Sequence, residues 1–76
     1  MKIAVKYFAN MRETMGKADE SVDISDNASV AELWKQVSNE AMPNNTLIAV
    51  NMEYTNDQHQ LKDGDEVAFF PPVTGG

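Results

Sequence analysis

The chain of 76 residues contains no cysteine and a single histidine, His59. Without cysteine it can form no disulfide, no thiolate metal site and no side-chain thiol nucleophile. His59 stands between two glutamines, a setting typical of a solvated loop, and one histidine argues against a metal cluster or a catalytic triad. Any sulfur chemistry of this protein would therefore have to use a sulfur atom supplied from elsewhere.

Long apolar segments and an excess of basic residues are also missing. Lys6, Asn10 and Arg12 interrupt the N-terminal region before a signal-peptide core could form, and no stretch approaches the ~20 residues that span a membrane. Twelve acidic residues oppose 6 lysines and arginines, which gives a formal net charge of -6. This charge disfavours nucleic acid and anionic membranes and favours a basic protein partner, although ordinary solubility would explain it equally well. We expect a cytoplasmic protein without a metal.

The residues that are present predict one small domain of strands and helices. Alternating apolar and polar residues predict strands, a continuous apolar run predicts a central strand covered on both faces, and good helix formers ending at Gly16 predict a short helix. The expected strands are 2–8, 20–24, 47–50, 52–55 and 66–70, and the expected short helix is 9–15.

A longer helix begins after Ser29. Ser29 and Glu32 have the spacing of a capping box, in which each side chain satisfies a free amide at the start of a helix. Apolar residues then recur at helical spacing until Pro43, namely Val30, Leu33, Trp34, Val37 and Ala41. Trp34 lies within this apolar stripe, so we interpret it as a core anchor and not as a ligand-stacking residue.

The order of these elements is typical of an α+β fold called the β-grasp, a mixed sheet with one long helix packed on one face plus a short helix. In that topology the first and last strands are parallel neighbours at the sheet centre. We expect a β-grasp domain over residues 1–70, followed by a C-terminal tail over 71–76.

Alternation within the two central strands predicts an exposed apolar surface. Val67 and Phe69 share the inward set of Ile3, Val5 and Tyr7 beneath the helix. Phe8 and Phe70 then fall together on the opposite face, where one long helix cannot cover them. Because clustered exposed aromatic residues mark interaction sites, we predict that Phe8 and Phe70 bind a partner. The alternative is that the short helix covers Phe8 and a proline ring covers Phe70.

The tail ends in Gly75 and Gly76. Glycines add nothing to a core, but they form a backbone thin enough to enter a narrow channel and present the terminal carboxylate to another protein. Pro71 and Pro72 favour an extended conformation, so the six residues Pro71, Pro72, Val73, Thr74, Gly75 and Gly76 could reach on the order of 20 Å. A frayed terminus is the alternative.

Nearly the whole chain resembles a known family. The segment 61–76, Tyr7-Phe8-Ala9 with Arg12, Glu13 and Gly16, and the segment 48–51 are similar to the MoaD/ThiS-type ubiquitin-like sulfur carriers, in particular the small subunits of molybdopterin synthase. The match is very specific over the last sixteen residues and weak on the helix face and over 53–60. Residues 40–46 form a shorter stretch than the family leads us to expect.

The resemblance implies a chemistry for the tail. An adenylating enzyme of the ubiquitin-activating type would use ATP to convert the carboxylate of Gly76 to an acyl-adenylate, and sulfur would replace AMP to leave a thiocarboxylate. The tail residues 71–75 would thread into the large subunit of molybdopterin synthase, where the sulfur builds the dithiolene of molybdopterin. Two small and two large subunits would form a heterotetramer. The chain itself would bind no cofactor and carry no catalytic group except its own terminus.

Three other interpretations stay open. A thiazole-pathway carrier uses the same mechanism but is typically shorter and lacks the helix near Arg12. A ubiquitin-like modifier would join Gly76 to lysines of other proteins. A plain β-grasp binding module would leave the tail without a function.

Overall fold

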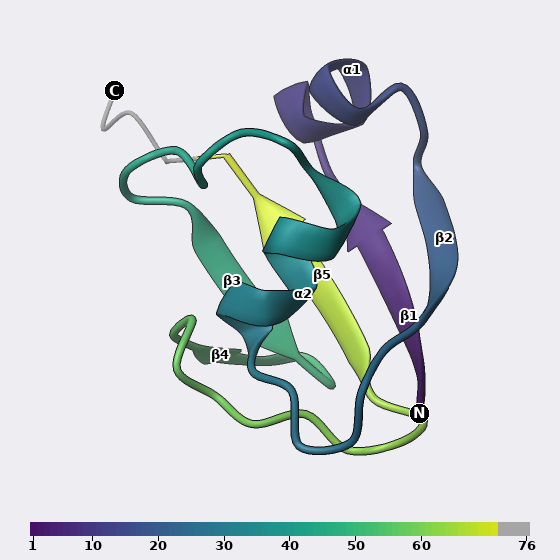
Figure 1. The fold of residues 1–76 in the computed structure, drawn as a ribbon. Coiled ribbons are helices and arrows are strands. Elements are labelled where there is room, and N and C mark those ends of the chain that lie inside the picture. The colour runs from purple at the N-terminus through teal and green to yellow at the C-terminus, as the bar shows by residue number, and fades with distance from the viewer. Residues whose placement is uncertain (72–76) are drawn as a thin grey trace.

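The computed structural model describes residues 1–71, which form five strands and two helices (Figure 1). The strands are β1 (Lys2–Tyr7), β2 (Asp19–Asp23), β3 (Leu47–Val50), β4 (Glu53–Thr55) and β5 (Glu66–Phe70). The helices are α1 (Asn10–Met15) and α2 (Val30–Val37). Each predicted strand is present, with bounds that shift by at most one residue.

The strands form one mixed sheet in the order β2-β1-β5-β3-β4. β1 and β5 are parallel neighbours at its centre, with Val5 opposite Val67 and Tyr7 opposite Phe69, and every other pair of neighbours is antiparallel. The α+β fold and the parallel central pair that the sequence predicted are therefore confirmed. The apolar run of β3 is an interior strand between β5 and β4, and Ile48, Ala49 and Val50 are all buried, as predicted for a strand covered on both faces.

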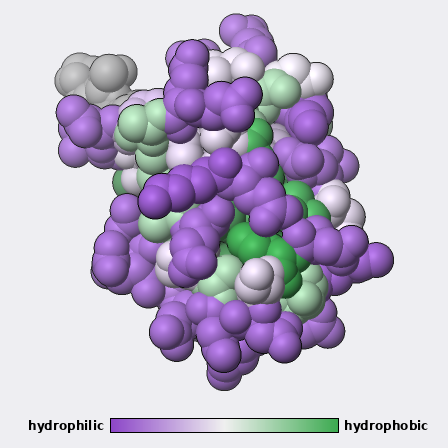
Figure 2. Space-filling model, in the orientation of Figure 1, coloured by the Kyte–Doolittle hydropathy of each residue, from purple (hydrophilic) through white to green (hydrophobic). Residues whose placement is uncertain are grey.

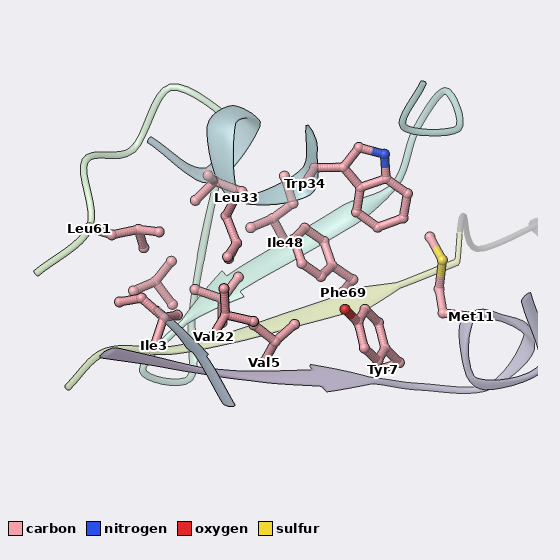
Figure 3. Close-up of a cluster of buried hydrophobic side chains, with 13 residues drawn as sticks. Ile3, Val5, Tyr7, Met11, Val22, Leu33, Trp34, Ile48, Leu61 and Phe69 are labelled. Carbon is pink, nitrogen blue, oxygen red and sulfur yellow. The ribbon is translucent and has the colours of Figure 1, made fainter. Parts of the chain in front are cut away.

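The core lies between α2 and one face of this sheet (Figure 3). Ile3, Val5 and Tyr7 alternate into it from β1, as the strand period predicts. Phe69 is fully buried and joins two aromatic partners: its ring centroid lies 6.1 Å from that of Tyr7, in a stacked pair, and 5.0 Å from that of Trp34, edge to face. Trp34 is 5% exposed, so its interpretation as a core anchor is confirmed.

α2 begins as predicted and ends earlier than predicted. Ser29 and Glu32 form the complete capping box, but the helix stops at Val37, and Ala41 lies outside it and is exposed. Ser38 adopts an extended conformation, and its hydroxyl accepts a hydrogen bond from the Glu40 amide at 3.2 Å. Serine side chains compete in this way with helical hydrogen bonds, and here the indole of Trp34 also holds the Glu40 carbonyl at 2.8 Å.

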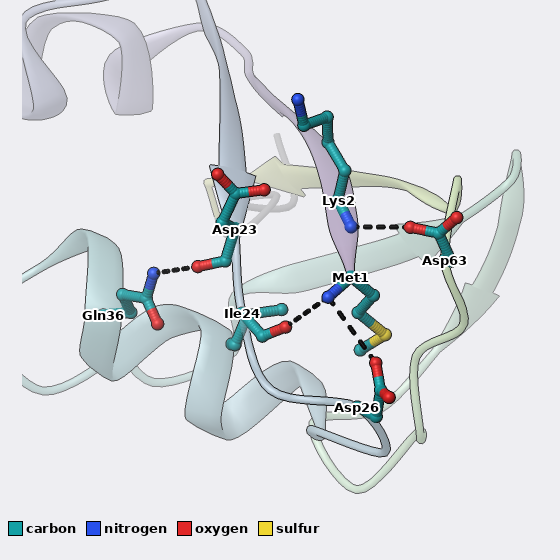
Figure 4. Close-up of polar contacts among 7 residues, drawn as sticks. All are labelled: Met1, Lys2, Asp23, Ile24, Asp26, Gln36 and Asp63. Atoms are coloured by element: carbon teal, nitrogen blue, oxygen red, sulfur yellow. Dashed lines mark hydrogen bonds and ion pairs between the residues drawn. The ribbon is translucent and has the colours of Figure 1, made fainter.

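At the end of the sheet where β1 begins, polar contacts connect the strands to neighbouring loops and to α2 (Figure 4). The Met1 amine donates to the Ile24 carbonyl at 2.7 Å and lies 3.5 Å from the Asp26 carboxylate. The Lys2 amide donates to Asp63 at 2.7 Å, and the Gln36 side chain donates to the Asp23 carbonyl at 2.6 Å. These contacts join β1 to the loops beside it and α2 to β2, at the opposite end of the sheet from Phe70.

The two faces of the sheet are unequal. Met11 of α1 and Val30, Leu33 and Trp34 of α2 all belong to the core, so both helices pack on the same face. The side on which α2 lies in front of the sheet carries mostly hydrophilic residues, with apolar residues visible near its middle (Figure 2). The opposite face of the sheet, which we call the helix-free face, is where the predicted aromatic pair lies. No helix among residues 1–71 is both long enough and apolar enough to cross a membrane.

Candidate partner-docking surface

Phe8 and Phe70 lie together on the helix-free face. Because Tyr7 pairs with Phe69 in the parallel β1–β5 ladder, the next residue on each strand points to the other side of the sheet. The two rings stack with centroids 4.6 Å apart and planes 11° from parallel. Phe8 is 41% exposed and Phe70 is half-buried. Their predicted proximity is confirmed, and Phe8 is exposed as predicted, whereas Phe70 is only partly exposed. Their role in binding a partner stays a prediction.

Two further apolar side chains, which the sequence pattern did not place on this face, also lie there. Tyr54 of β4 is 72% exposed, and its ring centroid lies 6.2 Å from that of Phe70. Met52, in the turn between β3 and β4, is 91% exposed. Phe8, Met52, Tyr54 and Phe70 together form what we call the apolar patch. The sequence indicated that Tyr54 points to the opposite face from its neighbours in the short strand 53–55. Which face of the sheet this is depends on the strand register, which only the fold supplies.

The apolar patch surrounds a shallow hollow of about 330 Å³. Its floor is made of Ala49 and Ala68, which pair directly across β3 and β5 and are 6% and 8% exposed. Lys6 and Glu66 complete the lining and form an ion pair at 3.5 Å. Because these two opposite charges pair with each other, the lining of the hollow has no net charge, and its floor is apolar.

Backbone conformations beside the apolar patch are unusual. Ala9, which follows Phe8 directly, has φ 50° and ψ −127°, a region that glycine adopts far more readily than alanine. Asn51 and Met52 have φ 51° and 71° and form the two-residue turn of the β3–β4 hairpin. Two left-handed residues match the turn that best fits the twist of a hairpin, but glycine is the usual second residue. Three of the five non-glycine residues with positive φ in the described chain therefore flank or belong to this patch.

A hydrogen-bonded cluster fixes the hairpin turn to the start of β5. The Asn51 amide nitrogen of the side chain donates to Asp65 at 2.9 Å, and the Glu66 backbone amide donates to the Asn51 side-chain oxygen at 3.0 Å. The Asn51 backbone amide donates to the Glu66 carbonyl at 2.8 Å. The other oxygen of Asp65 accepts from the Lys62 amide at 2.8 Å, so this buried carboxylate is satisfied on both sides.

The tail begins at the edge of the apolar patch. Pro71 follows Phe70 directly and is half-buried. The remaining predicted tail residues, Pro72, Val73, Thr74, Gly75 and Gly76, lie outside the described residues. The structure thus establishes where the tail starts, and its predicted reach and chemistry stay predictions.

Tyr7 is a titratable residue buried in the core. Burial raises the pKa of Tyr7 far above its ordinary value, and the hydrogen bond of its hydroxyl to Glu20, 2.6 Å long, acts in the same direction, as does the negative charge of Glu20. Tyr7 is therefore a neutral structural hydrogen-bond donor. Residues 1–71 contain no group of three or more His, Asp or Glu side chains placed to hold a metal ion. His59 is exposed and lies 3.4 Å from the Thr55 hydroxyl.

A second hollow of the described chain lies elsewhere. It encloses about 540 Å³ beside the end of α2, on the opposite side of the sheet from the apolar patch, and Trp34, Lys35, Glu40 and Asp57 are among its lining residues. Charged residues of both signs line it. None of the predicted site residues is among its lining residues.

The sheet order, the parallel central strands and the single capped helix across one face define a ubiquitin-like protein of the β-grasp fold. Comparison with known proteins gives the same class. The model of the ThiS family matches residues 5–76, and the chain belongs to this family.

Curated relatives match over the full length of the chain. The molybdopterin synthase sulfur carrier subunit of Escherichia coli is 40% identical over 81 residues, covering 97% of this chain and 99% of that protein. The protein of the same name from Chlamydomonas reinhardtii is 36% identical over 83 residues and covers all of both chains. The family resemblance found in the sequence is therefore confirmed.

Solved structures agree with this assignment. A putative molybdopterin converting factor subunit 1 from Pyrococcus furiosus has a TM-score of 0.78 at 31% identity and covers 96% of this chain and 99% of its own. Small archaeal modifier protein 1 of Haloferax volcanii has a TM-score of 0.82 at 22% identity, with 95% and 98% covered, which shows a shared fold. A chain from a complex of subunits 1 and 2 of the Helicobacter pylori molybdopterin-converting factor has a TM-score of 0.69 at 23% identity, with all of both chains covered.

Proposed function

We propose that this chain is the sulfur carrier subunit of a molybdopterin synthase. The observation that carries the proposal is the end-to-end similarity to sulfur carrier subunits. The described structure adds an exposed apolar patch at the residue where the tail begins. The absence of cysteine from the sequence is compatible with a carrier whose reactive sulfur is attached to the terminus.

The chemistry rests on the terminal carboxylate of Gly76. An ionised carboxylate, with an ordinary pKa of about 3.3–3.7, is a poor electrophile at neutral pH. A ubiquitin-activating-type enzyme transfers AMP from ATP to this carboxylate and releases pyrophosphate. A persulfide then displaces AMP at the acyl carbon to give an acyl disulfide, and a thiol cleaves this disulfide, which releases the thiocarboxylate and leaves a new disulfide between the thiol and the former persulfide sulfur. That sulfur is a nucleophile made without a cysteine side chain, and the pterin precursor accepts one such sulfur from each of two thiocarboxylated chains to form the dithiolene of molybdopterin.

The folded domain serves to position this group. Phe8 and Phe70 dock on the large subunit, and residues 71–75 run from there into its active site. Gly75 allows the chain to pass a wall that a Cβ atom would meet. Two large and two small subunits form a heterotetramer, the small subunit binds no cofactor of its own, and the assembly works in the cytoplasm. The complex formed by the Helicobacter pylori subunits supports a partner of this kind.

Intact-mass spectrometry of the chain, co-expressed with its adenylating enzyme, tests the proposal. We expect a mass gain equal to the exchange of one oxygen for sulfur. A variant with one residue added after Gly76 is the matched control and should gain nothing. Unmodified chain despite an active enzyme would refute the carrier function, and normal modification of the extended variant would refute the terminal mechanism.

A second measurement separates the proposal from its alternatives. A thiazole-pathway carrier would gain the same mass, so the thiocarboxylated chain must also convert the pterin precursor when the large subunit is added. Conjugates of higher mass, joined through Gly76 to lysines, would instead indicate a protein modifier.

A further inference from the structure

The hollow beside α2 is separate from the apolar patch, and we call it the helix-side groove. Part of its lining is a stripe at helical spacing along α2 and its C-terminal cap, made of Ala31, Trp34, Lys35 and Ser38. Residues 39–42 and Asp57, which lies in the loop after β4, complete the lining. The volume of about 540 Å³ is within the range of binding pockets.

Hydrogen bonds hold the walls of the helix-side groove in place. The Ala31 amide donates to the Asp57 carbonyl at 2.9 Å, which ties the loop after β4 to the first turn of α2. The Trp34 indole nitrogen donates to the Glu40 carbonyl at 2.8 Å, and the Trp34 ring is itself anchored against Phe69 in the core. The groove is therefore formed before any partner arrives, so little backbone freedom is lost on binding.

The charges of the helix-side groove favour a cation. Its lining contains two carboxylates, Glu40 and Asp57, against one ammonium group, Lys35. None of the three belongs to an ion pair within residues 1–71. Asp57 is half-buried and accepts one exposed hydrogen bond, from Gln58 at 3.2 Å, so its negative charge is not neutralised.

The helix-side groove extends to the end of the sheet at which the tail begins. Phe70 pairs with Leu47, so β5 ends beside the segment that leads from α2 into β3 (Figure 1). Residues 39–42 of this segment line the groove. The groove and the apolar patch thus lie on opposite faces of the sheet, and each reaches the end of β5. Two proteins can therefore hold the chain at the same time, one on each face.

Thiocarboxylation requires such an arrangement. The acyl-adenylate of Gly76 forms on the adenylating enzyme, and the persulfide must reach it while the tail is held there. We propose that the helix-side groove docks the protein that carries this persulfide, through one lysine or arginine side chain of that protein. The aliphatic stem of this side chain lies against Trp34 and Met42, and its charged end lies at Glu40 and Asp57. The proposal rests on the sulfur carrier function and adds no chemical step to it.

Charge variants of the groove test the proposal with two sulfur sources. Asp57→Asn and Glu40→Gln each remove a carboxylate, and Lys35→Glu reverses the one cation. Glu53→Gln, at an exposed carboxylate of β4 that does not line the groove, is the matched control. Each variant is incubated with the adenylating enzyme, ATP and either sodium sulfide or a purified cysteine desulfurase that carries a persulfide. No thiol is added, and intact mass gives the rate at which Gly76 gains sulfur, as the acyl disulfide adduct or as the thiocarboxylate.

The two sources should give different results. With the desulfurase, sulfur transfer should slow about threefold or more in Asp57→Asn and in Glu40→Gln, and it should become faster in Lys35→Glu. With sulfide, which displaces AMP directly and needs no docking surface, all variants should react like the wild type. Glu53→Gln should match the wild type with both sources.

The indole N–H resonance of Trp34, the single tryptophan of the chain, reports on the groove directly. In isotope-labelled wild type this resonance should shift when the desulfurase is added, and in the double variant Asp57→Asn/Glu40→Gln it should not. A shift that depends on the concentration of the chain alone would assign the groove to a second copy and overturn the proposal.

The remaining outcomes separate this inference from the carrier function. Equal rates in all variants with the desulfurase would overturn the inference, and so would a wild type that takes sulfur from sulfide but not from the desulfurase. Slowing of the groove variants with both sources would also overturn it, because the defect would then lie in folding or adenylation. A wild type that gains sulfur from neither source would refute the carrier function itself.

Discussion

Replacement of Ala9 by glycine should make the protein more stable, although glycine usually destabilises. Ala9 has φ 50° and ψ −127°, a conformation in which the Cβ atom is crowded by the backbone. A sparsely populated backbone conformation of this kind costs a residue with Cβ about 1–3 kcal/mol, and glycine forfeits about 0.4–1 kcal/mol through its freer unfolded state. Because Ala9 is exposed, removing its methyl group sacrifices little buried area. The net gain is about 1 kcal/mol, or a rise in Tm of about 4–8 °C for a domain of this size.

Ala41→Gly is the matched control for this prediction. Ala41 is also exposed and outside the helices, but it does not have positive φ. At this position glycine relieves no backbone strain and only makes the unfolded chain more flexible, so the same substitution should lower Tm by about 2–8 °C. Thermal unfolding followed by far-ultraviolet circular dichroism measures both variants. Equal changes in Tm for the two variants, or a lower Tm for Ala9→Gly, would refute the argument from backbone strain.

Two further predictions concern an exposed and a buried aromatic residue. Phe70→Ala should weaken binding to the large subunit by at least about tenfold and leave the domain folded. Phe69→Ala, one residue earlier and fully buried, should instead cost about 3–5 kcal/mol of stability. If binding titration and thermal unfolding show that Phe70→Ala loses mainly stability, Phe70 is a core residue. Tyr7→Phe should change the alkaline unfolding of the protein. The pKa of Tyr7 is raised in the folded state by burial and by Glu20, so the unfolded state loses this proton first, from about pH 10, and stability falls by about 1.4 kcal/mol per pH unit above that. Urea unfolding at pH 8 to 12 should show this decline in the wild type and less of it in Tyr7→Phe; parallel curves would contradict it.

The periodic parts of the fold could be predicted from the sequence because their signals are local. Alternation in β1 and β5 placed Phe8 and Phe70 on one face, and the Ser29–Glu32 pair marked the start of α2. The end of α2 could not be predicted in this way, because the competing hydrogen bonds of Ser38 and Trp34 to Glu40 depend on the tertiary path of the chain.

The full extent of the apolar patch was beyond the sequence for a related reason. Tyr54 lies opposite Ala49 only because Asn51 and Met52 make a two-residue turn, and a shift of one residue would move Tyr54 to the other face. Neither Ala9 nor Met52 is a residue type that signals positive φ. The sequence therefore predicted the half of the patch that lies on the two central strands and missed the half that depends on turn geometry.

The net charge of -6 and the apolar patch have separate physical roles in the proposed docking. Charges act over about 8–10 Å at physiological salt, so an acidic domain would be drawn towards a basic partner before contact and would associate faster. Within the hollow, Lys6 and Glu66 already pair, and the contacts that remain are aromatic and aliphatic. Burial of such contacts acts at short range, resists salt and mainly slows dissociation. Salt should therefore change the association rate much more than the dissociation rate, and substitutions in the apolar patch should do the reverse.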